Sequence, residues 1–481
     1  MPEPVVLVLG GLAIGLIPGV PRVELSPDVV FFVFLPPLVY ASAFTFSSEQ
    51  LRANARAIGF LAIGLVLATM AGVAAVAHWV VGIGWGPAFV LGAVLGPTDP
   101  VAATSVAKRL GAPDRIAAIL QGEALINDGT GLVTLKVAVG AVGASFALGS
   151  AALDFAYAGA AGVAVGLVVG FAAARLRRHI DEPQIEITIS LIAAYGAYVL
   201  ADRLEASGVL AGVAAGVYAG TRAPDVLSPA TRVQATAFFS SLGFMLESLL
   251  FLLVGLQIRH VLGGIERSAA ELAGYSAAVI AAVVLLRLAW MFTVPKLLAT
   301  DVPASERAVI GWSGLRGAVS LAAALSIPLT VAGDAFPDRA LVIFLAYVTV
   351  IATLVVPALT LPFLISRLGL AQSDTLRRQE LEVRRRLARM ALRRVDELAD
   401  RMPESAVERV RDVYEARIDA LEQEDRDERD DWRGAYRDLR RRLLAEERSA
   451  LARLRSEREV SPEILRELSQ ELDLEEARLT R

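Results

Sequence analysis

The chain has 481 residues, of which 55% are hydrophobic, and a formal net charge of −4. It contains no cysteine, which excludes disulfides, thiol chemistry and iron–sulfur clusters, and its three scattered histidines argue against a zinc site. More than half of its charged residues (47 Lys and Arg, 51 Asp and Glu) follow residue 370. Composition therefore predicts a transmembrane domain over residues 1–368 and a charged, soluble helical domain over residues 369–481.

The first of these domains contains twelve apolar stretches that predict membrane-spanning helices, for which about 20 residues suffice. An all-α, multi-pass membrane protein is therefore the expected fold class. The predicted segments cover residues 4–20, 28–46, 57–80, 85–107, 115–141, 155–175, 184–202, 207–221, 234–258, 269–299, 305–332 and 338–366.

Lys and Arg are concentrated in the gaps that share a side with the charged tail. Positively charged loops are retained in the cytoplasm, so this asymmetry predicts cytoplasmic amino and carboxyl termini in a plasma-membrane protein. An even number of spans agrees with both termini on one side.

Two of the predicted segments are interrupted by helix breakers. Gly96-Pro97-Thr98-Asp99-Pro100 places an acid at membrane depth in the fourth segment, and Gly311–Gly317 places Arg316 in the eleventh. The two segments are seven apart, and an odd offset reverses their direction across the membrane. Broken helices in corresponding, inverted positions predict a transporter site where they cross. There, Asp99 would neutralise facing helix N-termini and Arg316 facing C-termini.

The fifth segment carries two acids in an apolar run from Ile116 to Val142. Each carboxylate there costs roughly 2.5–3.5 kcal/mol on insertion scales, which indicates a functional role. Glu123 and Asn127 are four residues apart and share a helical face, whereas Asp128 lies about 100° further round. One acid can therefore be held by a partner while the other faces a cavity, as a proton-coupled ion carrier requires. Glu247 in the ninth segment lines either a cavity or an interface, and a structural role is favoured.

The tail is predicted to be helical, with a break at Pro403 and a last helix starting at Ser461-Pro462. Its arginines alternate with acids, so it is neither a polybasic lipid anchor nor an obvious nucleic-acid surface, and no nucleic-acid partner is expected. A regulatory or dimer-bracing role remains open beside that of a solvated surface.

With these motifs identified, residues 4–370 resemble the monovalent cation:proton antiporters. The resemblance is to the branch with Asn-Asp, which includes bacterial sodium/proton antiporters and animal sodium/hydrogen exchangers. The motifs that carry it are Glu123-x-x-x-Asn127-Asp128, Thr98-Asp99-Pro100, Gly314-Leu315-Arg316-Gly317, Phe34-Leu35-Pro36-Pro37-Leu38 and Phe251-Leu252-Leu253-Val254-Gly255-Leu256.

The resemblance implies an inverted-repeat antiporter fold with two crossed discontinuous helices, no cofactor and no enzymatic activity. It implies that Asp128 binds the cation and the proton alternately, that Asn127 orients the site, and that Thr98 supplies a backbone or hydroxyl oxygen. It further implies that Glu123 pairs with Arg316 while Asp99 balances the helix dipoles. A core of segments three to five and ten to twelve would move against a scaffold that also forms a homodimer.

This chain departs from the family pattern at two positions. Ala124 stands where many members have Ser, and no acid is present near Ala41. The missing hydroxyl bears on ion selectivity, so Na⁺, K⁺ and Li⁺ stay open as cargo.

The predicted function is the exchange of a monovalent cation, Na⁺ first, for H⁺ by alternating access, in pH and cation homeostasis. A single exchanging carboxylate predicts one proton per cation and electroneutral transport. The alternatives are a K⁺/H⁺ antiporter, a cation channel, or a membrane anchor for a tail with a signalling role. A channel needs a pore lined by rings of carbonyls or charges, and no filter-like loop is present.

Overall fold

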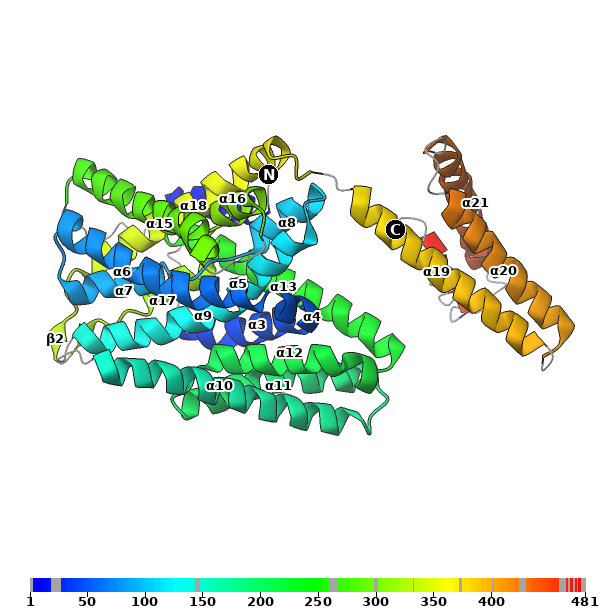
Figure 1. The fold of residues 1–481 in the computed structure, drawn as a ribbon, viewed down its shortest axis with the longest axis horizontal. Coiled ribbons are helices and arrows are strands. Elements are labelled where there is room, and N and C mark those ends of the chain that lie inside the picture. Colours follow the sequence, from blue (N-terminus) through cyan, green and yellow to red (C-terminus); the bar gives the residue numbers. More distant parts are fainter. Residues whose placement is uncertain are drawn as a thin grey trace. The chain divides into compact units, whose positions relative to one another are not determined.

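The computed structural model describes most of the chain (Figure 1). The described residues are 3–18, 27–142, 148–258, 261, 267–297, 302–331, 333–371, 374–399, 402–423, 430–457, 464–465, 468–469, 472–473 and 475–476. The chain divides into two compact units, Met1–Gln372 and Ser373–Arg481.

The described elements of the first unit are helical apart from one small hairpin. The helices are α1 Glu3–Leu16, α2 Pro27–Val29, η1 Val30–Phe34, α3 Leu35–Thr45, α4 Ser48–Ala53, α5 Ala55–Gly59, η2 Phe60–Leu65, α6 Val66–Val76, η3 Ala77–Val81, α7 Trp85–Val94, α8 Val101–Arg109, α9 Asp114–Val142, α10 Leu148–Arg177, α11 Pro183–Arg203, α12 Gly208–Val226, α13 Pro229–Leu256, α15 Ala269–Leu297, α16 Ala304–Trp312, α17 Ala318–Leu325 and α18 Arg339–Arg367. The antiparallel hairpin pairs β1 (Thr330–Val331) with β2 (Asp334–Ala335), and its turn includes Gly333 at a φ of 93°.

Helical elements occupy all twelve sequence ranges that were predicted to be membrane segments. Within the described residues, seven helices are long and apolar enough to cross a membrane by length and composition, and three shorter apolar helices accompany them. Both predicted interruptions are present: α7 and α8 are separated by residues 95–100, and α16 and α17 by residues 313–317.

The helices pack around two main hydrophobic clusters. The larger lies among α6 to α9 and α15 to α18 and also includes residues of α1 and α13, and the smaller lies among α3 and α11 to α13. Helices α10, α11 and α12 contact one another along one edge of the unit (Figure 1). The unit therefore consists of two helix groups, with α9 in contact with both.

Small residues set the distance between α10 and α12. Gly162, Gly166 and Gly170 recur every four residues along α10, and a Cβ at any of them would press on the α12 side at Ser207, Ala211 or Ala215. Spacing by four keeps the glycines on one helical face, so the two backbones can approach closely over two turns.

The second unit consists of helical hairpins stabilised by arginine. Helices α19 (Asp374–Leu398) and α20 (Glu404–Gln423) pack around Leu381, Ala388 and Leu421, and α20 begins directly after Pro403, as predicted. Arg385 Nη2 donates to the Leu421 carbonyl at 2.7 Å. Helix α21 spans Asp430–Glu457, and its Arg448 pairs with Asp473 and Glu476. The predicted helix start at Ser461-Pro462 lies outside the described residues.

Candidate functional site

Helix α9 directs its polar residues to two different environments. Glu123 and Asn127 are each 1% exposed and lie on the face that packs into the protein. Asp128 is half-buried and lines a cavity to which neither of the other two contributes. The spacing of four and one residues along a helix explains this division, which agrees with the prediction from the sequence.

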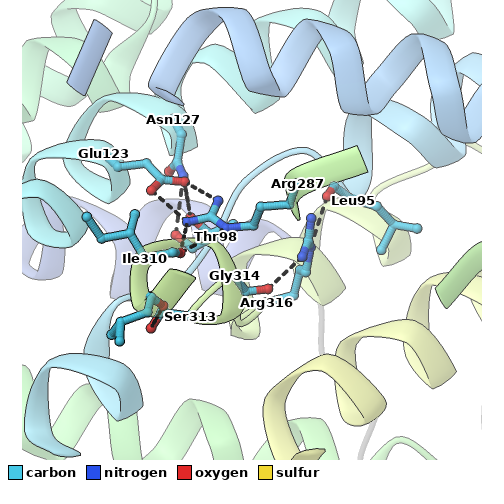
Figure 2. A network of polar contacts seen from close by, with 10 residues as sticks. Leu95, Thr98, Glu123, Asn127, Arg287, Ile310, Ser313, Gly314 and Arg316 are labelled. Carbon is cyan, nitrogen blue, oxygen red and sulfur yellow. Dashed lines mark hydrogen bonds and ion pairs between the residues drawn. The ribbon is translucent and has the colours of Figure 1, made fainter. Parts of the chain in front are cut away.

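Thr98 connects the two buried residues of α9 through its hydroxyl group (Figure 2). Its Oγ1 donates to Glu123 Oε1 at 2.8 Å and accepts a hydrogen bond from Asn127 Nδ2 at 2.9 Å. The Asn127 Nδ2 also lies 3.4 Å from the Thr98 carbonyl. The Asn127 Oδ1 is buried without a hydrogen-bond partner within the described residues, so one buried oxygen at this site is unused.

The predicted ion pair between Glu123 and Arg316 is wrong, because Glu123 pairs with Arg287 of α15. The guanidinium is bidentate, with Nη1 at 2.5 Å from Oε1 and Nη2 at 2.9 Å from Oε2. Arg287 is also 1% exposed and donates to the Ile310 carbonyl at 3.1 Å. A Cβ at Gly314 would collide with Cδ and Nε of Arg287, so the glycine leaves the passage through which this side chain reaches Glu123. The signal that sequence reasoning missed was a lone arginine in the apolar run of α15.

Arg316 instead lies at the carboxyl-terminal ends of two interrupted helices. Its Nε donates to the carbonyl of Leu95, directly after α7, at 3.2 Å, and its Nη1 donates to the carbonyl of Gly314, just after α16, at 2.5 Å (Figure 2). Both carbonyls lie at or just beyond the carboxyl-terminal end of a helix, where no N–H group of that helix follows to bond them. The guanidinium is therefore occupied by backbone carbonyls, which explains why it is not the partner of Glu123.

Asp99 lies at the amino-terminal ends of the other two half-helices. Its Oδ1 accepts a hydrogen bond from the backbone N–H of Val101, the first residue of α8, at 2.8 Å. Its Oδ2 lies against Gly317, the residue before α17, where a Cβ would collide with it. The Asp99 N–H donates to the Leu315 carbonyl at 2.8 Å, so the two interruptions also contact each other through the backbone.

A cavity of about 250 Å³ lies between these interruptions, α9 and the helices α3 and α13. Its polar lining includes Thr98, Asp99, Asp128, Ser42, Thr45 and Glu247. Since a water molecule takes about 30 Å³ of the liquid, this volume admits a cation together with several waters. Asp128 accepts no hydrogen bond within the described residues, and its carboxylate therefore remains available to an ion.

The two departures from the family pattern affect the cavity differently. Ala124 lines it, so the absent hydroxyl removes an oxygen from the cavity wall itself. Ala41 is buried in the smaller hydrophobic cluster and does not line the cavity. The acid that lines the cavity from the α3 and α13 side is Glu247, on α13.

A family model described as "sodium/hydrogen exchanger, transmembrane" matches residues 1–367. An uncharacterised Na⁺/H⁺ exchanger of Mycobacterium tuberculosis is 36% identical over 502 residues, covering 99% of this chain and 91% of the relative. The low-affinity Na⁺/H⁺ antiporter NhaS1 of Synechocystis is 32% identical, covering 85% of this chain and 78% of the relative.

The fold is similar to that of a solved antiporter structure. The sodium proton antiporter MjNhaP1 of Methanocaldococcus jannaschii superposes with a TM-score of 0.60 at 19% identity, covering 74% of this chain and 93% of the other. At that identity the likeness concerns the fold, which is that of an all-helical, multi-pass membrane protein.

Proposed function

The chain belongs to the sodium/hydrogen exchanger family, and we propose that it exchanges Na⁺ for H⁺ at Asp128, which holds the two ions in turn. The observation that carries the assignment is the position of Asp128 in the cavity. Within the described residues its carboxylate has no hydrogen bond or ion pair. Glu123, the other acid of α9, is bound by Arg287 and Thr98 and is therefore occupied. A single carboxylate cannot bind a proton and a cation together, so each ion displaces the other.

Oxygen atoms beside Asp128 complete the proposed cation site. Na⁺ is a hard cation that takes carboxylate, carbonyl, hydroxyl and water oxygens. Thr98 lines the same cavity, and the one hydrogen bond that its carbonyl accepts within the described residues is a long one, 3.4 Å, from Asn127. Asn127 orients Thr98 through the hydrogen bond to its hydroxyl, and its unused Oδ1 is a further oxygen beside the site.

The crossed half-helices would keep charge balanced around the ion. Asp99 faces the positive ends of α8 and α17, and Arg316 faces the negative ends of α7 and α16, which is the arrangement that opposes their dipoles. Because Asp99 and Arg316 already balance the helix ends, the charge of Asp128 is not needed there. The site can therefore gain or lose one cation.

The two helix groups support transport by alternating access. The group with α6 to α9 and α15 to α18 carries the exchange residues, and the group with α3 and α10 to α13 faces the cavity from the other side. We infer that the first group moves against the second, that the second also forms a homodimer, and that both termini are cytoplasmic. One exchanging carboxylate supports electroneutral exchange, and K⁺ is the alternative cargo because Ala124 removes a hydroxyl from the cavity wall.

The test is an Asp128→Asn variant in proteoliposomes, assayed by cation-induced dequenching of an internal pH dye. This variant removes the charge and keeps the shape, so exchange is expected to vanish while the melting temperature and oligomeric state stay near the wild-type values. Asp154→Asn, which alters an exposed acid on α10, serves as the matched control and is expected to transport normally. Wild-type exchange rates in Asp128→Asn would refute the assignment, and a large current in the wild type would indicate a channel instead.

A further inference from the structure

A second cavity, of about 440 Å³, adjoins the cavity at Asp128. We call the cavity at Asp128 the inner cavity and the second one the outer cavity. The two share four wall residues: Val101, Ser105, Glu247 and Phe251. We call the place where these four residues separate the two cavities the neck, and Glu247 is the ionisable residue among them. Any ion that passes between the outer cavity and Asp128 by this route passes Glu247.

Glu247 lacks the partners that a structural acid has in this protein. It is half-buried on α13, between the apolar residues Leu246 and Leu250, and it forms no hydrogen bond or ion pair within the described residues. By contrast, Glu123 has a bidentate arginine. An unpaired acid in an apolar membrane helix is costly, so its presence at the neck points to an ion that it meets there. No hydrogen bond or ion pair within the described residues supports the structural role predicted from the sequence.

The surroundings of Glu247 favour a cation over an anion. Asp99 and Asp128 line the inner cavity, and the outer cavity is lined by Glu3 and Arg109, so the neck lies between two acids and an entrance with one acid and one base. The Ser105 hydroxyl donates to the Val101 carbonyl at 2.8 Å, which leaves its oxygen lone pairs free to face a cation. Carboxylate and hydroxyl oxygens with water are the ligands that a hard monovalent cation takes.

We propose that Glu247 is a second cation site, a staging carboxylate at which the incoming monovalent cation is held before it reaches Asp128. This inference rests on the proposed exchange at Asp128 and adds to it a residue that determines the apparent affinity. A staging carboxylate attracts the cation into the neck and raises its local concentration beside Asp128.

The kinetic test compares Glu247→Gln with wild type in proteoliposomes, measuring initial exchange rates against Na⁺ concentration at low ionic strength. The expected result is an increase in KM of about tenfold, the lower end of the concentrating effect of a charged cleft, with kcat largely retained. Added choline chloride should raise the KM of the wild type more than that of Glu247→Gln, because salt screens the Glu247 charge, which only the wild type carries. Glu247→Asp, which keeps the charge, should recover most of the affinity.

Two kinetic outcomes would overturn the proposal. One is an unchanged KM in Glu247→Gln, which would make the residue structural. The other is an equal rise in KM for Glu3→Gln, the other acid of the outer cavity, which would show a diffuse field in place of a site.

A binding measurement separates this proposal from the exchange site itself. In an Asp128→Asn background, Na⁺ at raised concentration should still stabilise the purified protein against heat relative to choline. Adding Glu247→Gln should abolish that residual stabilisation. If the double variant is stabilised as much as Asp128→Asn, the staging site is refuted whether or not Asp128 exchanges ions. Absence of exchange in the wild type would instead refute the proposed function.

Discussion

Replacing Arg287 with alanine should destabilise the protein far more than replacing Asp128, the proposed exchange acid. Arg287 and Glu123 are each 1% exposed and joined by two short contacts of 2.5 and 2.9 Å. Removing one partner of such a pair leaves a buried charge uncompensated, at a cost of about 3–5 kcal/mol. The Ile310 carbonyl would also lose the N–H groups that it accepts from.

This loss should be visible in a thermal unfolding assay of the purified protein in detergent. At about 2 °C per kcal/mol for a protein of this size, Arg287→Ala should melt about 6–10 °C below wild type. Arg222→Ala is the matched control, because Arg222 forms a 3.6 Å pair with Asp225 in which both side chains are more than half exposed. Such a surface pair contributes at most about 1 kcal/mol, so its melting temperature should hardly change.

A double-mutant cycle identifies which arginine is the partner of Glu123. The coupling between Glu123→Gln and Arg287→Met should be on the order of 1–3 kcal/mol, whereas that between Glu123→Gln and Arg316→Met should be smaller. Removing both members of the true pair should also recover part of the stability lost in either single variant. Equal melting temperatures for Arg287→Ala and Arg222→Ala, or stronger coupling to Arg316, would refute the assigned pairing.

Two further outcomes are expected. Gly314→Ala should lower the melting temperature, because its Cβ would occupy the path of the Arg287 side chain. Gly196→Ala on α11, where a Cβ meets open space, should leave the melting temperature unchanged or raise it slightly. Equal shifts for the two variants would argue against a path for Arg287 beside Gly314. Truncation after Leu370 should preserve exchange but alter its pH profile or maximal rate, since no long linker separates the tail from the last transmembrane helix; an unchanged pH–activity curve and dimer fraction would leave the tail without a regulatory role.

Much of the helical framework follows from local sequence. Apolar runs gave the positions of the long helices, and the Gly-Pro-Thr-Asp-Pro and Trp-Ser-Gly-Leu-Arg stretches located both interruptions, because proline and glycine act on the backbone where they stand. The separation of Asp128 from Glu123 and Asn127 was equally predictable, since helical periodicity determines which residues share a face.

Contacts between distant segments were not predictable in the same way. Arg287 lies in the apolar helix α15 and Arg316 in the interruption between α16 and α17, and nothing in their neighbours along the chain indicates which one reaches Glu123. The choice depends on the space beside Gly314 and on the carbonyls left free by α7 and α16, which exist only once the segments are packed. Glu247 was assigned a structural role for the same reason, because a cavity is a property of several helices together.

If Asp128 exchanges the ions as proposed, helix α9 carries residues for stability and a residue for transport within one turn. Glu123 forms an ion pair with Arg287, and the Asn127 amide donates a hydrogen bond to Thr98, so polar contacts hold the buried face of the helix. Within the described residues Asp128 accepts no hydrogen bond, and it lines the cavity, so its charge can change without breaking such a contact. An acid that also stabilised the fold would be protonated or bound to a cation only at the expense of that stability. Asp128→Asn should therefore abolish exchange and hardly change the melting temperature, whereas Arg287→Ala should lower the melting temperature strongly. If Asp128 and Glu123 shared one network of contacts, both variants would lower the melting temperature.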